Sequence, residues 1–197
     1  MSSRGTEIGM LPETVIRPPA RWPSLGLADF WKFRDLLQVP AWEAAERGVW
    51  ARFIELAGEF NESMPQYVVD KAVEVLDESG KSVRGAKVLD LGFSYKADID
   101  DDRESPSFEI IELLKDLGAD VAYCDPYAPK VRRMRKHDLG LVSVLCNADE
   151  FGRYDVLVVS TAHREFRNPA LRTKAKLLVD ARNLFPAGTP ACPVVRA

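Results

Sequence analysis

Two basic side chains in one polar segment are the residues best suited to chemistry. Lys96 and Arg103 lie between Gly92 and Pro106, after an apolar run and before a helix-like pattern. An ammonium and a planar guanidinium both bind phosphate or carboxylate oxygens. The segment lacks the G-x-G-x-x-G pattern with which a backbone loop holds a dinucleotide pyrophosphate. The two cations could bind an anionic ligand, or they could only pair with their acidic neighbours, Asp98, Asp100, Asp101, Asp102 and Glu104.

The acidic residues of this segment do not predict a metal site. Asp98, Asp100, Asp102 and Glu109 match positions 1, 3, 5 and 12 of an EF-hand loop, but Arg103 stands where that loop needs glycine. A guanidinium at this position would also repel the ion. We therefore expect no calcium or other metal here.

Histidine and cysteine give weaker signals. His163 follows a strand-like run and could act as a general base or bind a ligand hydroxyl, but a loop-capping role is the better interpretation. Cys124 is expected to be a buried structural residue. The cysteines, which also include Cys146 and Cys192, are odd in number and lack a C-x-x-C pair, and this favours a reducing, cytoplasmic setting. No catalytic nucleophile is predicted.

Alternating strand and helix patterns position these residues. Apolar runs predict strands at 87–92, 120–124, 141–145, 154–160 and 175–180, and helices over 105–117 and 129–137. Strands that alternate with helices imply a parallel sheet with helices on both faces. We therefore predict an α/β, Rossmann-like domain over 81–197, with its ligand at the carboxyl ends of the strands. Lys96, Arg103, His163 and Arg182 all follow such ends.

The residues before this domain have a different composition. All 4 tryptophans fall within the first fifty residues, together with several of the 13 prolines, and this predicts an irregular, amphipathic extension over 1–40. Residues 41–80 have a helical apolar period, with a kink or a junction of two helices expected at Pro65 and an end at Gly80. The apolar face of this long helix exceeds what one small domain needs, which favours packing against another subunit or domain.

Charge and hydropathy exclude some partners. The chain has 27 Lys and Arg against 30 Asp and Glu, a net charge of −3, so it has no general attraction to nucleic acid or to anionic lipid. No apolar run approaches the roughly 20 residues that span a bilayer. We therefore expect neither nucleic-acid binding nor a transmembrane segment.

Six segments, in this order, resemble the UDP-glucose/GDP-mannose dehydrogenase family: FIELAGEFN (53–61), MPQYVV (64–69), LGFSYK (91–96), DDRESPS (101–107), CDPY (124–127) and DARN (180–183). The first of these looks most like the UDP-N-acetylhexosamine 6-dehydrogenases. The resemblance implies an enzyme that oxidises a sugar C6 alcohol twice, with two NAD, through a cysteine-bound thioester. By position it also implies that Lys96 and Arg182 bind the UDP-sugar and that Arg103 reaches NAD held by an opposite domain.

The chain departs from the family in what it lacks. Neither the dinucleotide fingerprint nor the Gly-rich segment with the nucleophilic cysteine is present in the sequence. The resemblance therefore implies the C-terminal, UDP-sugar-binding domain of a dehydrogenase of surface polysaccharide biosynthesis, inactive alone. Its partners would be a separately encoded NAD-binding domain and a second copy, bound through the long helix.

Residues 19–37 suggest an alternative, because they resemble the cytoplasmic lead-in of polysaccharide-export ABC transporter permeases. On that interpretation the chain is a non-catalytic nucleotide-sugar-binding or scaffolding module at an export machine. A recombination remnant without activity is a third possibility.

Overall fold

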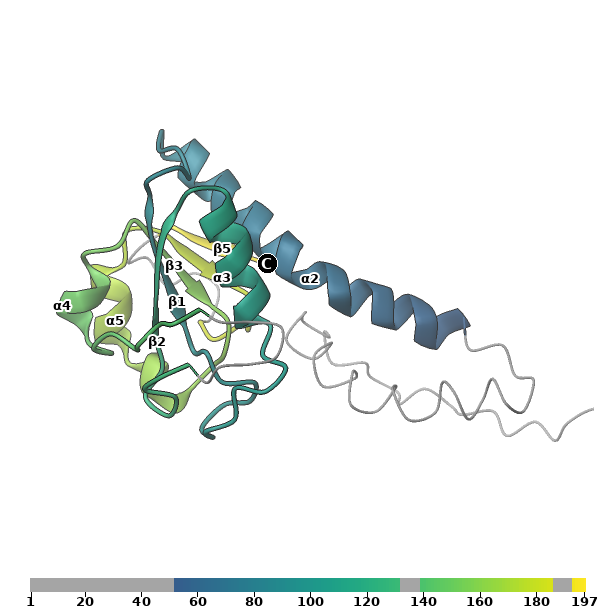
Figure 1. Cartoon of the computed structure of the whole chain (residues 1–197). Coiled ribbons are helices and arrows are strands. Elements are labelled where there is room, and N and C mark those ends of the chain that lie inside the picture. Colours follow the sequence, from purple (N-terminus) through teal and green to yellow (C-terminus); the bar gives the residue numbers. More distant parts are fainter. Residues whose placement is uncertain (1–51, 132–138, 186–192) are drawn as a thin grey trace, which may run out of the picture.

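The computed structural model describes residues 52–131, 139–185 and 193–197 (Figure 1). The predicted extension over 1–40, residues 41–51 of the predicted long helix and most of the predicted helix over 129–137 lie outside these residues. Among the described helices, none combines the length and the apolar character that a membrane crossing requires.

Five parallel strands form the central sheet, which confirms the predicted fold class. Their spatial order is β2-β1-β3-β4-β5. Because β2 pairs with one side of β1 and β3 with the other, the direction in which the chain adds strands reverses between β1 and β3. The strands are β1 (Lys87–Leu91), β2 (Asp120–Cys124), β3 (Val156–Val159), β4 (Leu178–Asp180) and β5 (Val194–Arg196).

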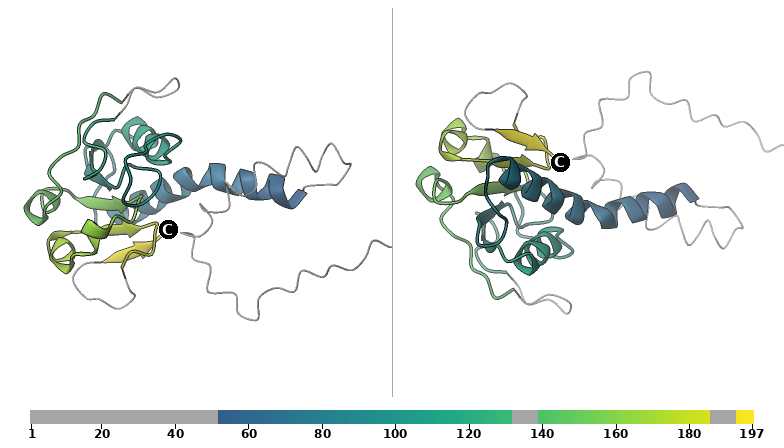
Figure 2. Two further views of the ribbon diagram at one scale, coloured as in Figure 1. Left: turned by 90° about the horizontal axis from the view of Figure 1, so that it is seen from below. Right: turned by 90° about the horizontal axis from the view of Figure 1, so that it is seen from above.

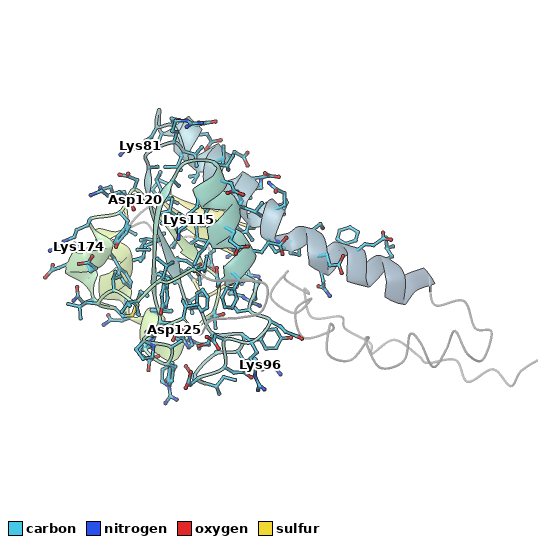
Figure 3. The ribbon with its side chains drawn as sticks, in the orientation of Figure 1. Lys81, Lys96, Lys115, Asp120, Asp125 and Lys174 are labelled. Atoms are coloured by element: carbon cyan, nitrogen blue, oxygen red, sulfur yellow. A yellow bond between two sulfur atoms is a disulfide. The ribbon has the colours of Figure 1, made fainter. Side chains whose placement is uncertain are left out.

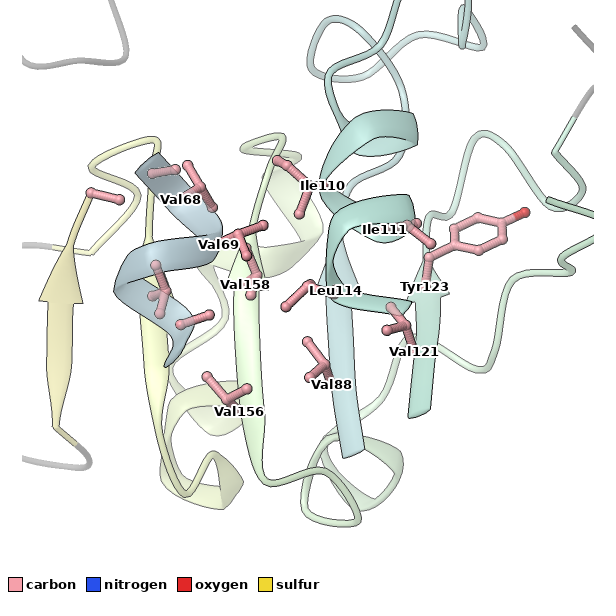
Figure 4. Packing of buried hydrophobic residues seen from close by; sticks show 14 of the residues in the cluster. Val68, Val69, Val88, Ile110, Ile111, Leu114, Val121, Tyr123, Val156 and Val158 are labelled. Atoms are coloured by element: carbon pink, nitrogen blue, oxygen red, sulfur yellow. The ribbon is translucent and has the colours of Figure 1, made fainter. Parts of the chain in front are cut away.

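Helices cover both faces of the sheet (Figure 1). On one face, α2 (Arg52–Glu78) and α3 (Ser107–Asp116) pack on side chains that include Val88 and Val158, as Figure 4 shows. On the other face, Leu89 and Val159 share a buried cluster with residues of α4 (Ala148–Phe151) and η1 (Arg164–Arg167), and α5 (Pro169–Lys174) packs against α4. Successive side chains of a strand point to opposite faces, so both clusters draw on the same strands.

The long helix α2 runs through Pro65 as one element of 27 residues and ends before Gly80, which has a φ of 75°. Its C-terminal half buries Val68, Val69, Ala72, Val75 and Leu76 against the sheet. Its N-terminal half extends away from the domain, as Figure 2 shows. There Leu56 and Phe60 are 50% and 56% exposed, so this helix has more apolar surface than its own domain covers.

One predicted strand is wrong and one observed strand was not predicted. Residues 141–145 form no strand; only Val142 makes an isolated bridge, with Lys130, and both Val142 and Leu145 are exposed. The fifth strand is β5, at the end of the chain. Short apolar runs lack a period long enough to separate a strand from an extended loop, and β5 has only three residues.

Candidate functional site

The candidate site lies at the carboxyl ends of β1, β3 and β4, where the strand order reverses. At this point in an open parallel sheet, the loops that leave neighbouring strands turn apart and form a crevice. Gly92 begins the first loop with a φ of 86°, and a Cβ atom there would collide with the carbonyl of Thr161. The hydroxyl of Thr161 donates to the carbonyl of Ser94 at 2.5 Å. The loops after β1 and β3 are therefore in direct contact.

Asp125, directly after β2, holds this part of the backbone together. Its buried carboxylate accepts hydrogen bonds from the backbone N–H groups of Ser94, Tyr127 and Ala128, at 2.7 to 2.9 Å. Burial opposes ionisation of Asp125, but the hydrogen bonds from His163 and from backbone N–H groups outweigh it and lower its pKa to about 2. In the sequence Asp125 stood out only as part of the CDPY segment (124–127), which does not indicate this role.

His163 fixes the loop and is not available as a base. Its ring is fully buried, Nδ1 accepts from the backbone N–H of Asp98 at 2.9 Å, and Nε2 lies 3.0 Å from Oδ2 of Asp125. Since Nδ1 accepts, Nε2 carries the hydrogen and donates it to Asp125. The structure therefore supports the loop-capping interpretation of His163.

One group of described residues brings possible metal ligands together. Asp98, His163 and Glu165 each offer an atom, and these atoms lie within 4.8 Å of one another. Both ring nitrogens of His163 already make hydrogen bonds, however, and Nε of Arg164 lies 3.4 Å from Asp98. A metal ion here would be repelled by the guanidinium and would find no free lone pair on the imidazole. We therefore do not assign a metal to this group.

The structure places Lys96 and Arg103 on the surface of the same loop. Lys96 is exposed, with Nζ 5.3 Å from the centre of the Tyr95 ring, and lies at the same end of the domain as Asp125 (Figure 3). Arg103 donates from two nitrogens to the two carboxylate oxygens of Asp101, at 2.9 and 3.0 Å. For Arg103, the pairing with an acidic neighbour that the sequence left open is therefore present.

Arg182 approaches the same place from the end of β4. Asp180 orders the turn, because its carboxylate accepts from the backbone N–H groups of Arg182, Leu184 and Phe185. Nε of Arg182 donates to the carbonyl of Ser160. Burial lowers the pKa of Arg182 to about 10, and nearby Tyr95 opposes this shift, so the guanidinium remains charged at neutral pH.

A second buried carboxyl group lies behind these residues. Asp90, on the central strand β1, is fully buried, and its Oδ1 accepts from the hydroxyl of Ser160. Burial raises the pKa of Asp90 to about 7, although the hydroxyls of Ser160 and Ser107 oppose the shift. The sequence carries one signal for Asp90, which the motifs above do not include: central parallel strands are apolar on both faces, so an acid among their residues stands out.

The cysteines differ from the expectation. Cys124 is fully buried, as predicted, but it forms a disulfide with Cys146, with Cα atoms 5.5 Å apart. These two cysteines are therefore not the free thiols that a reducing setting implies. The bond joins the segment before α4 to the end of β2, where the backbone N–H of Asp125 also bonds to the hydroxyl of Ser143. Partners 22 residues apart could not be paired from the sequence.

Comparisons with known proteins agree with this arrangement. Residues 89–187 match the family described as UDP-glucose/GDP-mannose dehydrogenase family, UDP binding domain. The UDP-N-acetyl-D-mannosamine dehydrogenase of Methanocaldococcus jannaschii is 28% identical over 155 residues, which cover 76% of this chain and 34% of that protein. The UDP-glucose 6-dehydrogenase of Rhizobium meliloti is 33% identical over 117 residues, 57% of this chain and 26% of that protein. The chain thus spans about a third of the length of the curated relatives it matches.

Solved structures show the same fold. The NDP-N-acetyl-D-galactosaminuronic acid dehydrogenase of Methanosarcina mazei is 26% identical, with a TM-score of 0.60 over 73% of this chain and 31% of that chain. A UDP-glucose dehydrogenase of Pyrobaculum islandicum has a TM-score of 0.64 over 84% of this chain and 36% of that chain, at 24% identity. At this identity the second likeness speaks for the fold alone.

Proposed function

Since the chain belongs to the UDP-glucose/GDP-mannose dehydrogenase family, through the UDP-binding domain of that family, we propose that it binds a UDP-sugar for NAD-dependent oxidation at C6. The observation that carries this proposal is that Arg182, after β4, comes within electrostatic range of Tyr95, whose neighbour Lys96 lies in the loop after β1, at the reversal of strand order. Two cations at this point suit a diphosphate. The product would serve the biosynthesis of a surface polysaccharide.

The two cations would do different work on the ligand. Arg182 is held by the carbonyl of Ser160 and stays charged, so its guanidinium offers a fixed direction to phosphate oxygens. Lys96 has an exposed ammonium on a flexible stem that rests on Tyr95, and it suits a less constrained oxygen of the diphosphate or the sugar. Both interactions bind and orient the substrate, and neither transfers a proton.

NAD fits this domain poorly as a main binding site. The N–H groups of Ser94, Tyr95 and Asp98, which could cradle a pyrophosphate, already donate to Asp125, to the carbonyl of Asp101 and to His163. We therefore assign NAD binding to another domain and propose that Arg103 contacts it at the edge. To do so, the Arg103 guanidinium would leave the Asp101 carboxylate and bind a phosphate of NAD, so that one anionic partner replaces another.

Turnover then needs a second domain that carries the NAD site and the nucleophilic cysteine, in the same or a separate chain. We propose that the exposed apolar half of α2 is covered by that domain or by a second copy of this chain. A cytoplasmic location stays a prediction. The disulfide between Cys124 and Cys146 argues against it, because such bonds are rare in reducing compartments. The export-linked alternative rests on residues 19–37, outside the described residues, and gains no support from the structure.

Calorimetric titration of the 197-residue chain tests the proposal. UDP-N-acetylglucosamine should bind, Lys96→Ala and Arg182→Ala should each weaken binding by about tenfold or more, and Lys174→Ala should leave it unchanged. Lys174 is an exposed cation on the far side of the domain (Figure 3), which makes it a matched control. NAD should bind weakly or not at all. Tight binding of NAD without any binding of UDP compounds would show that the site is wrongly assigned.

A further inference from the structure

Asp90 and Arg182 contact the same residue, Ser160. The hydroxyl of Ser160 donates to Oδ1 of Asp90, and the carbonyl of Ser160 accepts from Nε of Arg182. Asp90 and Ser160 are 0% and 2% exposed, so no solvent separates the members of this chain of contacts. Ser160 thus connects the Asp90 carboxyl directly to the Arg182 guanidinium.

Stability does not explain an acid at this position. Asp90 lies on the central strand between Leu89 and Leu91, which are both buried. Removing a carboxyl from water costs free energy, and an apolar residue of similar volume commonly stabilises a core at least as well. The fixed connection to Arg182 is the feature of Asp90 that an apolar residue could not supply.

We propose that Asp90 is a positioning residue that sets the affinity of Arg182 for the diphosphate, acting through Ser160. This inference rests on the proposed function, in which Arg182 contacts the diphosphate. When Asp90 is ionised, its charge attracts the guanidinium and competes with the ligand phosphates. When Asp90 is protonated, the full charge of Arg182 acts on the ligand. UDP-sugar affinity should therefore fall as Asp90 loses its proton.

The change falls in the neutral range, because burial raises the pKa of Asp90 to about 7. Four groups act on the ionisation of Asp90: Ser160 from the end of β3, Ser107 from the start of α3, Asp125 from the end of β2 and Arg182 after β4. Asp125 stays ionised throughout, since its pKa is about 2, and Arg182 stays charged. A bound diphosphate adds negative charge beside Asp90, so binding should also take up protons.

The first experiment measures the affinity of the 197-residue chain for UDP-N-acetylglucosamine across neutral pH. Both phosphates of this ligand are esterified, so the ligand itself does not titrate there. Between about pH 6 and pH 8 the wild-type affinity should fall by about three- to tenfold, while Asp90→Asn keeps the higher affinity throughout.

Two control variants separate Asp90 from other acids and from the imidazole near it. Asp120→Asn changes an exposed acid at the opposite end of the domain (Figure 3), and it should follow the wild type. His163→Gln removes the imidazole that contacts Asp125, and the affinity of this variant should still fall as pH rises. If the affinity falls in parallel with pH in the wild type and in Asp90→Asn, the inference about Asp90 is overturned. The proposed function would still hold in that case, provided that the UDP-sugar binds and that Arg182→Ala weakens its binding. A wild type without UDP-sugar affinity, or an Arg182→Ala variant that binds normally, would instead overturn the proposed function.

A second measurement decides the coupling without any ligand. The Nε–H resonance of Arg182, assigned from its loss in Arg182→Ala, should shift with pH in the wild type, with a midpoint near the pKa of Asp90. In Asp90→Asn the shift should vanish, and in Ser160→Ala it should be reduced because the connecting hydroxyl is gone. A resonance that moves identically in wild type and Asp90→Asn would rule out the coupling, whatever the binding data show.

Discussion

Nε2 of His163 lies 3.0 Å from Oδ2 of Asp125, and both side chains are fully buried. Through this contact the end of β2 and the residues after β3 meet beneath the loop over 92–106. Asp125 accepts from the N–H of Ser94, and His163 accepts from the N–H of Asp98. The loop that carries Lys96 is thus held at two points by one pair of side chains.

His163→Ala should release this loop. The variant removes the side-chain donor of the buried Asp125 carboxylate, and leaving a buried charged group short of a hydrogen bond costs about 3 kcal/mol of unfolding free energy. Urea unfolding measures the loss, and UDP-N-acetylglucosamine binding should weaken as well. Arg167→Ala, at an exposed position nearby, is the control. Unchanged stability of His163→Ala would contradict the role assigned to the pair.

Gly92→Ala should be far more damaging than Gly80→Ala. Both glycines have a positive φ, of 86° and 75°, so alanine is strained by about 1 kcal/mol or more at either position. At Gly80 the new methyl group meets nothing within 4 Å, whereas at Gly92 it collides with the backbone of Thr161. We expect Gly92→Ala to lose at least about 3 kcal/mol of unfolding free energy. Equal losses in the two variants would show that the contact between the loops is looser than described.

Asp90→Asn should change how stability depends on pH. The pKa of Asp90 is about 7 in the folded chain against 3.8 as its ordinary value, so the folded state binds the proton more tightly. The tighter binding of the proton contributes at most on the order of 4 kcal/mol to the free energy of unfolding. This contribution is fully present below pH 3.8 and is lost as the pH rises to about 7. Urea unfolding at several pH values should find Asp90→Asn more stable than the wild type at alkaline pH. A wild type that matches the variant there would refute the shifted pKa.

Breaking the disulfide should destabilise the domain. A bond that closes a loop of 22 residues restricts the unfolded chain and contributes about 3 kcal/mol. Cys146→Ser should therefore lower the midpoint of urea unfolding under non-reducing conditions, and a dithiol reductant should lower that of the wild type similarly. Cys192→Ser changes the third cysteine and should have no such effect. Wild-type unfolding that is insensitive to reductant would indicate that the bond does not form in solution.

Much of the fold could be predicted because it depends on local pattern. The strands around Val88, Val121 and Val158 are apolar runs between turn residues, and Gly80 and Gly118 end helices where the backbone needs a positive φ. The failures occurred where the pattern is short. The run over 141–145 is apolar but lies outside the sheet, held by the disulfide and by the bond of Ser143 to Asp125, while the three residues of β5 are too few to show a period.

The sequence by itself determined the fold class, the family and the strand ends from which Lys96, Arg103 and Arg182 come, because spacing along the chain and residue type suffice for these. Only the tertiary structure decided which of them meet. It brought Arg182 within electrostatic range of the segment that carries Tyr95 and Lys96, paired Arg103 with Asp101, and buried Asp90 behind Ser160. The reason is physical: hydrogen bonds and pKa shifts depend on distance and burial between residues that are remote in the chain, such as Asp90 and Ser160, 70 positions apart.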